Sequence, residues 1–411
     1  MTDALLPRYI APLMQEALSD TPVVCLLGPR QVGKTTLAQQ YCDGFTYINF
    51  DDRTLLNAAK QDPTGFIQGL PEHVILDEVQ RVPELMPAIK ASVDQNRKPG
   101  RFLLTGSANL LLLPGVQESL AGRVEVLNMY PLTEQEKHRC ESSLLEALLN
   151  NQLSPKIVGE QSVVQGVAEA VCNGGYPEPN TRSPNRARQW HRQYLNAIIQ
   201  RDVKDIAAIR DETEMSRLME MLSYRTGNLL NTSSLATELG MGRDTTEKYI
   251  TILERLFLIR RLPAWHRNQA KRLVKAPKIH VIDSGLAATL NDLTAEDWNN
   301  HSTDFGPLLE SFVVQQLISQ STWVDNEIKF SHYRDKDQVE VDLVIERGRN
   351  VWGVEVKKAA SIQGKDGAGL ARLASQAGSS FKGGMLLYCG NNTLPLNEHN
   401  CFAVPMNALW S

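Results

Sequence analysis

One short loop, Gly28–Thr35, has the residue types and the spacing of a phosphate-binding loop. Its sequence is GPRQVGKT, with a lysine and a threonine directly after the second glycine. Glycine lets backbone N–H groups turn toward phosphate oxygens, the lysine reaches the β- and γ-phosphates, and the threonine hydroxyl binds Mg²⁺. The sequence therefore predicts a site for ATP and Mg²⁺ formed by Gly28, Pro29, Arg30, Gln31, Val32, Gly33, Lys34, Thr35 and Thr36.

Two acids, Asp77 and Glu78, follow an apolar run and fit the second half of such a site. Asp77 is expected to hold Mg²⁺ together with Thr35, and Glu78 to polarise the attacking water. Polar residues after the next apolar run could sense the γ-phosphate; Thr105, Ser107 and Asn109 all qualify, and Ser107 is favoured.

Arg123, further along the chain, could stabilise transition-state charge within its own chain or from a neighbouring subunit. The alternative is that Arg123 is an ordinary surface arginine.

A second set of chemically active residues lies near the C-terminus. Apolar and polar residues alternate on both sides of Gly348-Arg349, which predicts a β-hairpin with Asp342 opposite Glu355. Two carboxylates and an ammonium would then converge, as a Mg²⁺-dependent phosphodiesterase requires. The residues predicted to form this nuclease site are Asp342, Glu355 and Lys357, and the alternative is a solvated hairpin face with alternating charges.

A third feature is the stretch between Arg255 and Ile282, which contains no acidic residue. Its cations would create a strong positive field, although the whole chain has a net charge of −4. This favours DNA or another nucleic acid as a partner, and the alternative is packing against an acidic protein partner. The residues predicted to bind nucleic acid are Arg260, Arg261, Arg267, Lys271 and Arg272.

The elements that position these residues indicate an α/β chain. Short apolar runs read as strands of a parallel sheet covered on both faces: 23–27, 46–50, 73–77 and 101–105. Residues 136 to about 205 are predicted to be mainly helical, with loops at 174–180 and 182–185. Helices at 233–240 and 243–256 precede strands at 257–264 and 278–283. The last part is α/β again, with a helix at 307–320, three strands, a helix and a final strand.

Composition gives few further constraints on the 411-residue chain. Its six cysteines are scattered without a CxxC pair, and its N-terminus does not resemble a signal peptide. The longest apolar run, Leu110–Pro114, is too short to cross a membrane. The sequence therefore predicts a soluble cytoplasmic protein.

Taken together, the motifs resemble known families. Four segments resemble a bacterial and archaeal group of AAA+ ATPases: GPRQVGKTT (28–36), LDEVQ (76–80), LLTGS (103–107) and SLAGR (119–123). The helix–turn–helix and following hairpin resemble a winged helix. The Asp342 hairpin resembles the PD-(D/E)xK nuclease superfamily, with Val341 in place of its usual proline. This second resemblance implies that Glu310 is the helical acid of the nuclease site.

These resemblances imply a domain order and a function. The expected domains are an AAA+ ATPase (1–135), a helical linker (136–212), a winged helix (213–295) and a restriction-endonuclease-like domain (296–411). They imply an ATPase that acts on nucleic acid with a Mg²⁺-dependent nuclease domain. The alternative is a regulatory ATPase switch that binds a protein or DNA partner without cleavage. AAA+ relatives often form rings, so a homo-oligomer is also expected.

Overall fold

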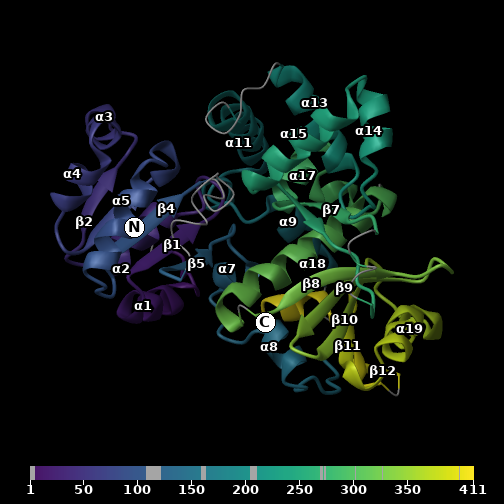
Figure 1. The fold of residues 1–411 in the computed structure, drawn as a ribbon. Helices are drawn as coiled ribbons and strands as arrows, with labels where there is room; N and C mark the ends of the chain where they lie inside the picture. Colours follow the sequence, from purple (N-terminus) through teal and green to yellow (C-terminus); the bar gives the residue numbers. More distant parts are fainter. Residues whose placement is uncertain are drawn as a thin grey trace.

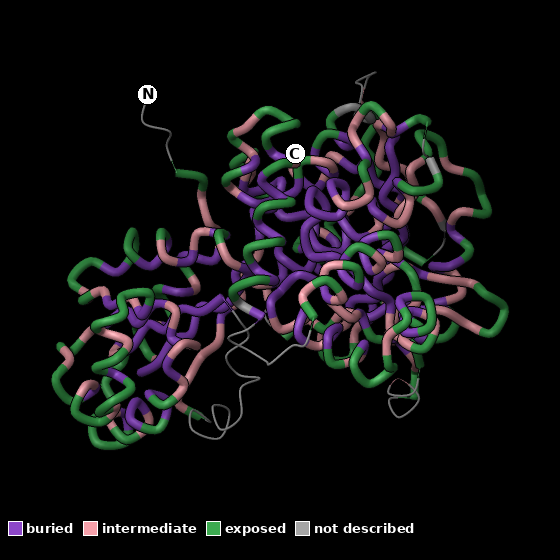
Figure 2. Tube along the Cα trace, turned by 90° about the horizontal axis from the view of Figure 1, so that it is seen from above, coloured by how far each residue is buried: buried purple, intermediate pink, exposed green. Residues whose placement is uncertain are grey.

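The chain folds into two lobes in the computed structural model, with the N-terminal sheet in the smaller one (Figures 1 and 2). The larger lobe contains a helical middle region and a C-terminal mixed sheet. The structure describes residues 5–107, 122–158, 163–203, 211–268, 272, 275–300, 302–325, 327–397 and 399–411.

The smaller lobe is built on a five-stranded parallel sheet of order β2-β3-β4-β1-β5. Its strands are β1 (Val23–Leu27), β2 (Thr46–Asn49), β3 (Val74–Asp77), β4 (Phe102–Gly106) and β5 (Val124–Asn128). The four predicted strands and their parallel arrangement are confirmed, and β5 is an additional strand. Because all strands run in one direction, their carboxyl ends lie at one edge of the sheet.

Both faces of this sheet are buried, as predicted. Val24 and Leu26 of β1 belong to one hydrophobic core, whereas Val23, Cys25 and Leu27 belong to another. The alternation follows from the strand period of two residues. The covering helices are α1 (Ala11–Asp20), α2 (Lys34–Tyr41), α3 (Arg53–Gln61), α4 (Pro63–Gln68) and α5 (Leu85–Gln95).

The middle region is helical. Its first helices are α7 (Glu134–His138), α8 (Leu144–Leu149), α9 (Val163–Asn173), α10 (Pro177–Asn180) and α11 (Pro184–Ala197). The segment 174–180 was expected to be only a loop, but it contains α10. Pro177 stands at the first position of this helix, where a missing N–H costs nothing.

The middle region continues with three helices and a two-stranded antiparallel sheet. These are α13 (Glu212–Tyr224), α14 (Thr232–Leu239), α15 (Arg243–Arg255), β6 (Ile259–Leu262) and β7 (Lys278–Val281), followed by α17 (Ser284–Leu290). Gly240 ends α14 at φ 68°, a conformation that glycine adopts without strain. The predicted helices and strands of this segment are therefore confirmed as elements.

The C-terminal region is a six-stranded mixed sheet of order β12-β13-β11-β10-β9-β8. It consists of α18 (Ser302–Val324), β8 (Lys329–Arg334), β9 (Glu340–Arg347), β10 (Asn350–Lys357), α19 (Ala368–Ala377), β11 (Phe381–Tyr388), β12 (Leu394–Asn397) and β13 (Cys401–Pro405). Arg347 pairs with Asn350, so the predicted turn at Gly348-Arg349 is confirmed. The sequence predicted one strand after α19, where the structure has three.

One hydrophobic core extends from the first sheet through the middle helices into the C-terminal sheet, so the lobes share buried side chains. Among the residues that the structure describes, no helix combines the length and the apolar character that crossing a membrane requires.

Candidate nucleotide site

The phosphate-binding loop joins β1 to α2 at the carboxyl edge of the sheet. A Cβ atom added at Gly28 would lie 1.9 Å from the carbonyl oxygen of Met129, so only glycine fits there. Gly33 has φ 96° and directly precedes α2, a backbone geometry that other residues rarely adopt. The N–H groups of the first turn of α2 therefore begin at the loop, where they can bind an anion.

Lys34 lies inside this loop with 6% of its surface exposed. Its Nζ donates to the carbonyl oxygens of Gly28 and Pro29, at 2.9 and 2.7 Å. These acceptors are uncharged, and phosphate oxygens are stronger acceptors for an ammonium group. The loop thus holds Lys34 where an incoming phosphate can replace the carbonyl oxygens.

Asp77 lies beside Thr35, as predicted for a Mg²⁺ site. The Thr35 hydroxyl donates to Asp77 Oδ2 at 2.8 Å, and the Tyr47 hydroxyl donates to the same oxygen at 2.6 Å. Thr105 donates to the other carboxylate oxygen. Mg²⁺ in phosphate sites is held by one or two protein oxygens together with substrate phosphates, and Thr35 and Asp77 fit that donor set.

Tyr47 was not predicted from the sequence. Burial and its hydrogen bond to Asp77 raise the pKa of Tyr47 above its ordinary value, so this phenol stays a donor at neutral pH. Its position in the apolar run 46–50 does not indicate that its hydroxyl contacts Asp77 at the end of β3.

Glu78 follows Asp77 in a left-handed conformation, φ 58° and ψ 38°, which is uncommon for a residue with a side chain. Such local strain is typical of functional sites. Its carboxylate accepts from Gln80 and, at 3.2 Å, from Ser107, and it lies 3.7 Å from the Arg30 guanidinium. The structure thus brings Ser107 into contact with Glu78; Gln80 was not predicted in this role.

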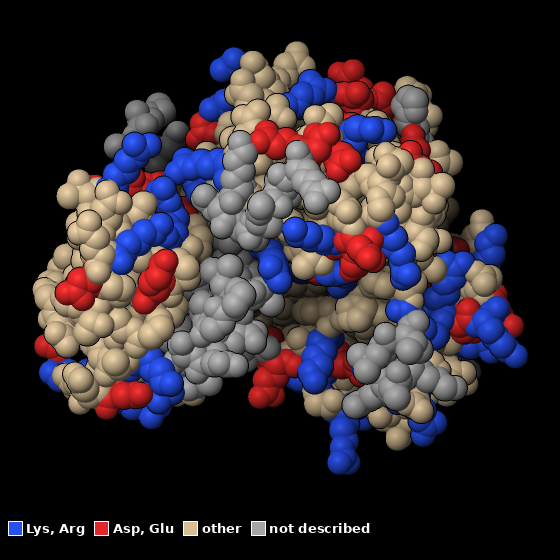
Figure 3. Space-filling view, turned by 45° about the horizontal axis from the view of Figure 1, so that its top comes forward, with Lys and Arg blue, Asp and Glu red and all other residues tan. Residues whose placement is uncertain are grey.

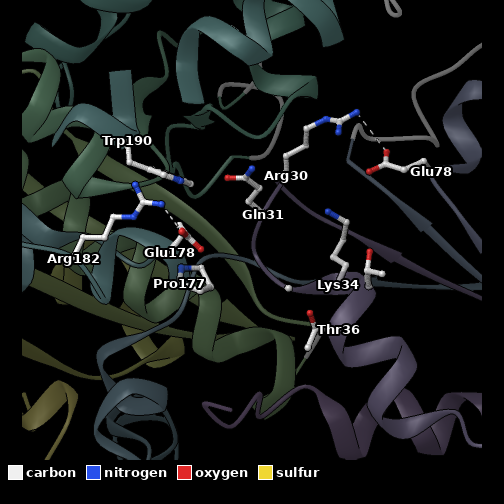
Figure 4. Close-up of a pocket in the computed structure, with 11 residues that line it drawn as sticks. Arg30, Gln31, Lys34, Thr36, Glu78, Pro177, Glu178, Arg182 and Trp190 are labelled. Atoms are coloured by element: carbon white, nitrogen blue, oxygen red, sulfur yellow. Dashed lines mark hydrogen bonds and ion pairs between the residues drawn. The ribbon is translucent and has the colours of Figure 1, made fainter. Parts of the chain in front are cut away.

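A cavity of about 680 Å³ opens between the phosphate-binding loop and the middle region. Its far wall comes from α10, α11 and the segment between them, and Figure 4 shows Arg182 and Trp190 facing the loop. Glu178 pairs with Arg182 one helical turn away. The sequence placed these residues only in a loop and a helix, because nothing in their spacing indicates that they face Lys34.

Arg123 does not lie at this cavity in its own chain. Val124 pairs with Val23 at the start of β1, so Arg123 precedes the amino end of β5, opposite the phosphate edge. Its side chain pairs with Asp94 at 2.5 Å. The expected role within its own chain is therefore wrong, whereas a role across a subunit contact stays a prediction. Asn109 and residues 119–121 lie outside the described residues.

The C-terminal hairpin has the predicted register. The last pair of its ladder is Val354 with Leu343, and the Val356 N–H donates to Asp342 Oδ2 at 2.9 Å. Glu355 and Asp342 are the residues that follow this last pair on the two adjacent strands. Burial and, second, the charge of Asp342 raise the pKa of Glu355 to about 8. Lys357, half-buried on the same strand, lowers that pKa in part.

Lys278, which was not predicted to lie at this hairpin, forms ion pairs with two of the predicted acids. Lys278 Nζ lies 2.7 Å from Glu310 Oε1 and 3.4 Å from Asp342 Oδ1. Within the described ranges, no group of three or more His, Cys, Asp or Glu side chains is arranged to hold a metal ion. Because the Lys278 ammonium already pairs with Glu310 and Asp342, these residues do not fit the Mg²⁺ that the nuclease resemblance implies.

The basic segment is compensated by acids from elsewhere in the chain. Arg261 pairs with Glu247 and Glu254 of α15, and Arg272 makes two hydrogen bonds to Glu346 of β9. In Figure 3 acidic side chains lie among the basic ones on the face shown. The prediction of a field without compensating acids is therefore wrong for these cations and for Lys278.

The remaining members of the segment lie in different surroundings. The Arg260 guanidinium lies 4.8 Å from the centre of the Tyr130 ring, and Arg267 is exposed. Lys271 lies outside the described residues.

Comparisons with known proteins agree with the geometry of the N-terminal lobe. Residues 20–138 match the model of an AAA domain. Residues 164–297 and 305–409 match two domains of unknown function, DUF8612 and DUF4143. Residues 20–138 therefore form an AAA-type ATPase domain, and nothing in these matches supports a nuclease.

Similar proteins span most of the chain. An uncharacterized protein of Mycobacterium tuberculosis is 29% identical over 356 residues, which cover 86% of this chain and 74% of that protein. An uncharacterized protein of Methanocaldococcus jannaschii is 24% identical over 78% of this chain and 71% of its own length. A solved Walker-type ATPase of Pyrococcus abyssi has a TM-score of 0.43 at 14% identity and covers 71% of this chain and 97% of its own.

Proposed function

We propose that this chain binds and hydrolyses ATP in the AAA-type domain formed by residues 20–138. One observation carries the proposal: Lys34, Thr35, Asp77 and Glu78 meet at the carboxyl edge of one parallel sheet. Lys34, Thr35 and Glu78 line the cavity of about 680 Å³, and Asp77 accepts a hydrogen bond from Thr35. Ligands bind at this edge in open α/β sheets.

The loop residues would bind the phosphates. Lys34 would exchange the carbonyl oxygens of Gly28 and Pro29 for phosphate oxygens, since charged acceptors form stronger hydrogen bonds. Thr35 and Asp77 would hold Mg²⁺, which neutralises charge on the phosphates when it is bound. Tyr47 and Thr105 keep the Asp77 carboxylate oriented toward Thr35.

Glu78 would position the attacking water and accept its proton. Gln80 and Ser107 donate to its carboxylate, and the Arg30 guanidinium lies 3.7 Å from it. Arg182 lines the opposite wall of the cavity, so we infer that it stabilises charge on the phosphates during hydrolysis. To do so, it must leave Glu178.

A second cavity, next to the first, could bind the adenine ring of ATP. It has a volume of about 580 Å³ and shares Gly33, Thr36 and Pro177 with the first. Apolar side chains, including Val32 and Met129, form much of its wall. Flat aromatic ligands bind in concave apolar sites of this kind.

The proposal is limited to ATP turnover. The ion pairs of Arg261 and Arg272 remove much of the charge from which a nucleic-acid partner was inferred. The observations thus favour the regulatory ATPase over a nucleic-acid-cleaving machine. ATP would act on the contact between the loop and the middle region, since the cavity lies between them.

Phosphate release and titration of a fluorescent ATP analogue would test the proposal. Lys34→Ala should lower turnover by about 100-fold or more and weaken ATP binding, since a charged donor to the phosphates is lost. Lys60→Ala changes an exposed lysine of the same domain and should leave both values unchanged. Turnover at the wild-type rate by the Lys34→Ala protein would show that this loop is not the site.

A further inference from the structure

A group of carboxylates in the larger lobe surrounds the buried side chain of Lys278. This residue lies at the start of β7 and is 3% exposed. Its Nζ lies 2.7 Å from Glu310, 3.4 Å from Asp342 and 3.7 Å from Glu340. We call Lys278 and these three carboxylates the Lys278 cluster.

We propose that Lys278 takes the place of a divalent cation among these carboxylates, so that the C-terminal sheet holds the middle region and does not cleave nucleic acid. The ammonium meets the same two acids, Glu310 and Asp342, that the nuclease resemblance assigned to Mg²⁺. An ammonium at 2.7 Å from Glu310 Oε1 competes with a metal ion for that oxygen.

The electrostatics agree with this assignment. Burial alone would lower the pKa of Lys278, but Glu310 and Asp342 outweigh burial and raise that pKa above its ordinary value. The lysine is therefore charged at neutral pH. The neighbouring histidines stay neutral: burial and the charge of Lys278 lower the pKa of His332 to about 4 and that of His280 well below its ordinary value.

The third predicted acid does not complete a metal site. A Cβ atom added at Gly369 would lie 2.0 Å from Glu355 Oε1, so this oxygen lies against the backbone at the start of α19. Glu355 also accepts a hydrogen bond from the Leu370 N–H. Its orientation is thus explained by contact with α19, and Lys278 pairs with the other acids.

The Lys278 cluster joins segments that are far apart in the sequence. Lys278 comes from the small sheet of the middle region, Glu310 from α18, and Glu340 and Asp342 from β9. The same contact includes the backbone bond from Trp265 N to the His332 carbonyl oxygen, at 2.6 Å. The cluster therefore lies where the hairpin of the middle region meets the C-terminal sheet.

A cleavage assay tests the first half of the proposal. The full-length protein is incubated with single- and double-stranded DNA and RNA, with Mg²⁺ or Mn²⁺, beside an Asp342→Asn protein. The expected result is no metal-dependent cleavage above that of the Asp342→Asn protein. Cleavage that requires the metal and disappears with Asp342→Asn would overturn the proposal.

Thermal unfolding tests the second half. Lys278→Ala should lower the Tm by about 5 °C or more, because it leaves buried carboxylates without their counterion. Millimolar Mn²⁺ should restore part of this loss by entering the vacated place. The double variant Lys278→Ala/Asp342→Asn should not recover with Mn²⁺, and Lys275→Ala, a change of a nearby exposed lysine, should leave the Tm unchanged.

An unchanged Tm in Lys278→Ala would show that the ammonium stabilises nothing, which would overturn the proposal. If the Lys278→Ala protein does not fold, Mn²⁺ binding to the wild-type protein tests the proposal instead. Mn²⁺ binding measured without nucleotide by electron paramagnetic resonance should be the same in the wild-type and Asp342→Asn proteins. Binding that is lost with Asp342→Asn would contradict the proposal.

Discussion

Two buried lysines, Lys34 and Lys278, lie in different parts of this chain, and their acceptors differ. Lys34 is 6% exposed and donates to the carbonyl oxygens of Gly28 and Pro29 beside a large cavity. Lys278 is 3% exposed and donates to Glu310 and Asp342. The Lys34 ammonium thus donates to backbone carbonyl oxygens, and the Lys278 ammonium donates to carboxylates.

The difference indicates what each lysine can do. Neutral acceptors compensate an ammonium only in part, so an anion that enters the cavity gains a strong interaction at Lys34. Lys278 already has carboxylate partners, and burial makes separation of such ion pairs costly. Burial of a lysine beside acids therefore does not by itself indicate a binding site; the charge of its acceptors and access to a cavity do.

The largest effect is expected when Glu78, the acid at the cavity beside Lys34, is replaced. Glu78→Gln should lower kcat for ATP hydrolysis by about 10²- to 10⁴-fold and leave ATP binding nearly unchanged, because the amide cannot accept a proton from water. Steady-state kinetics and equilibrium binding would measure the two effects. Glu84→Gln, an exposed change near the same strand, serves as the control. A Glu78→Gln protein with normal kcat would exclude Glu78 as the base.

A smaller effect is expected from the wall that faces Lys34. Arg182→Ala should lower kcat about 10-fold or more, since Arg182 can reach the phosphates across the cavity. In the monomeric protein Arg123→Ala should have little effect, because Arg123 lies at the opposite edge of the sheet. Turnover would be measured at protein concentrations below and above any self-association. The reverse ranking of the two variants would point to Arg123 acting from a neighbouring subunit.

The smallest effect is expected at Glu355, next to Asp342 in the C-terminal hairpin, and it depends on pH. Burial and the charge of Asp342 raise the pKa of Glu355 in the folded protein to about 8, from an ordinary value of 4.5. The stabilising contribution of Glu355 to the free energy of unfolding is therefore fully present below about pH 4.5. It is lost as the pH rises through about 8. Glu355→Gln should gain stability relative to the wild type over this range.

Denaturant unfolding at pH 5 and pH 8.5 would measure this relative gain. A constant difference between the two proteins at both pH values would contradict the raised pKa.

The fold could be predicted well where one short segment carries the signal. The four runs predicted their strands correctly because each is short, mainly apolar and flanked by polar or turn residues. The hairpin at Gly348-Arg349 gave its register because strand side chains alternate with a period of two. The strands β12 and β13 were not predicted separately, since they are short and close to the end of the chain.

The sequence by itself determined the phosphate-binding loop, the acids Asp77 and Glu78, and the pairing of Asp342 with Glu355. Each depends on neighbours along the chain or on one turn. Only the tertiary structure decided which charges meet across long separations. It brought Arg182 to the phosphate-binding loop and Glu346 to Arg272, and it placed Lys278 between Glu310 and Asp342. Charge patterns along a chain cannot show such compensation, because packing of distant elements chooses the partners.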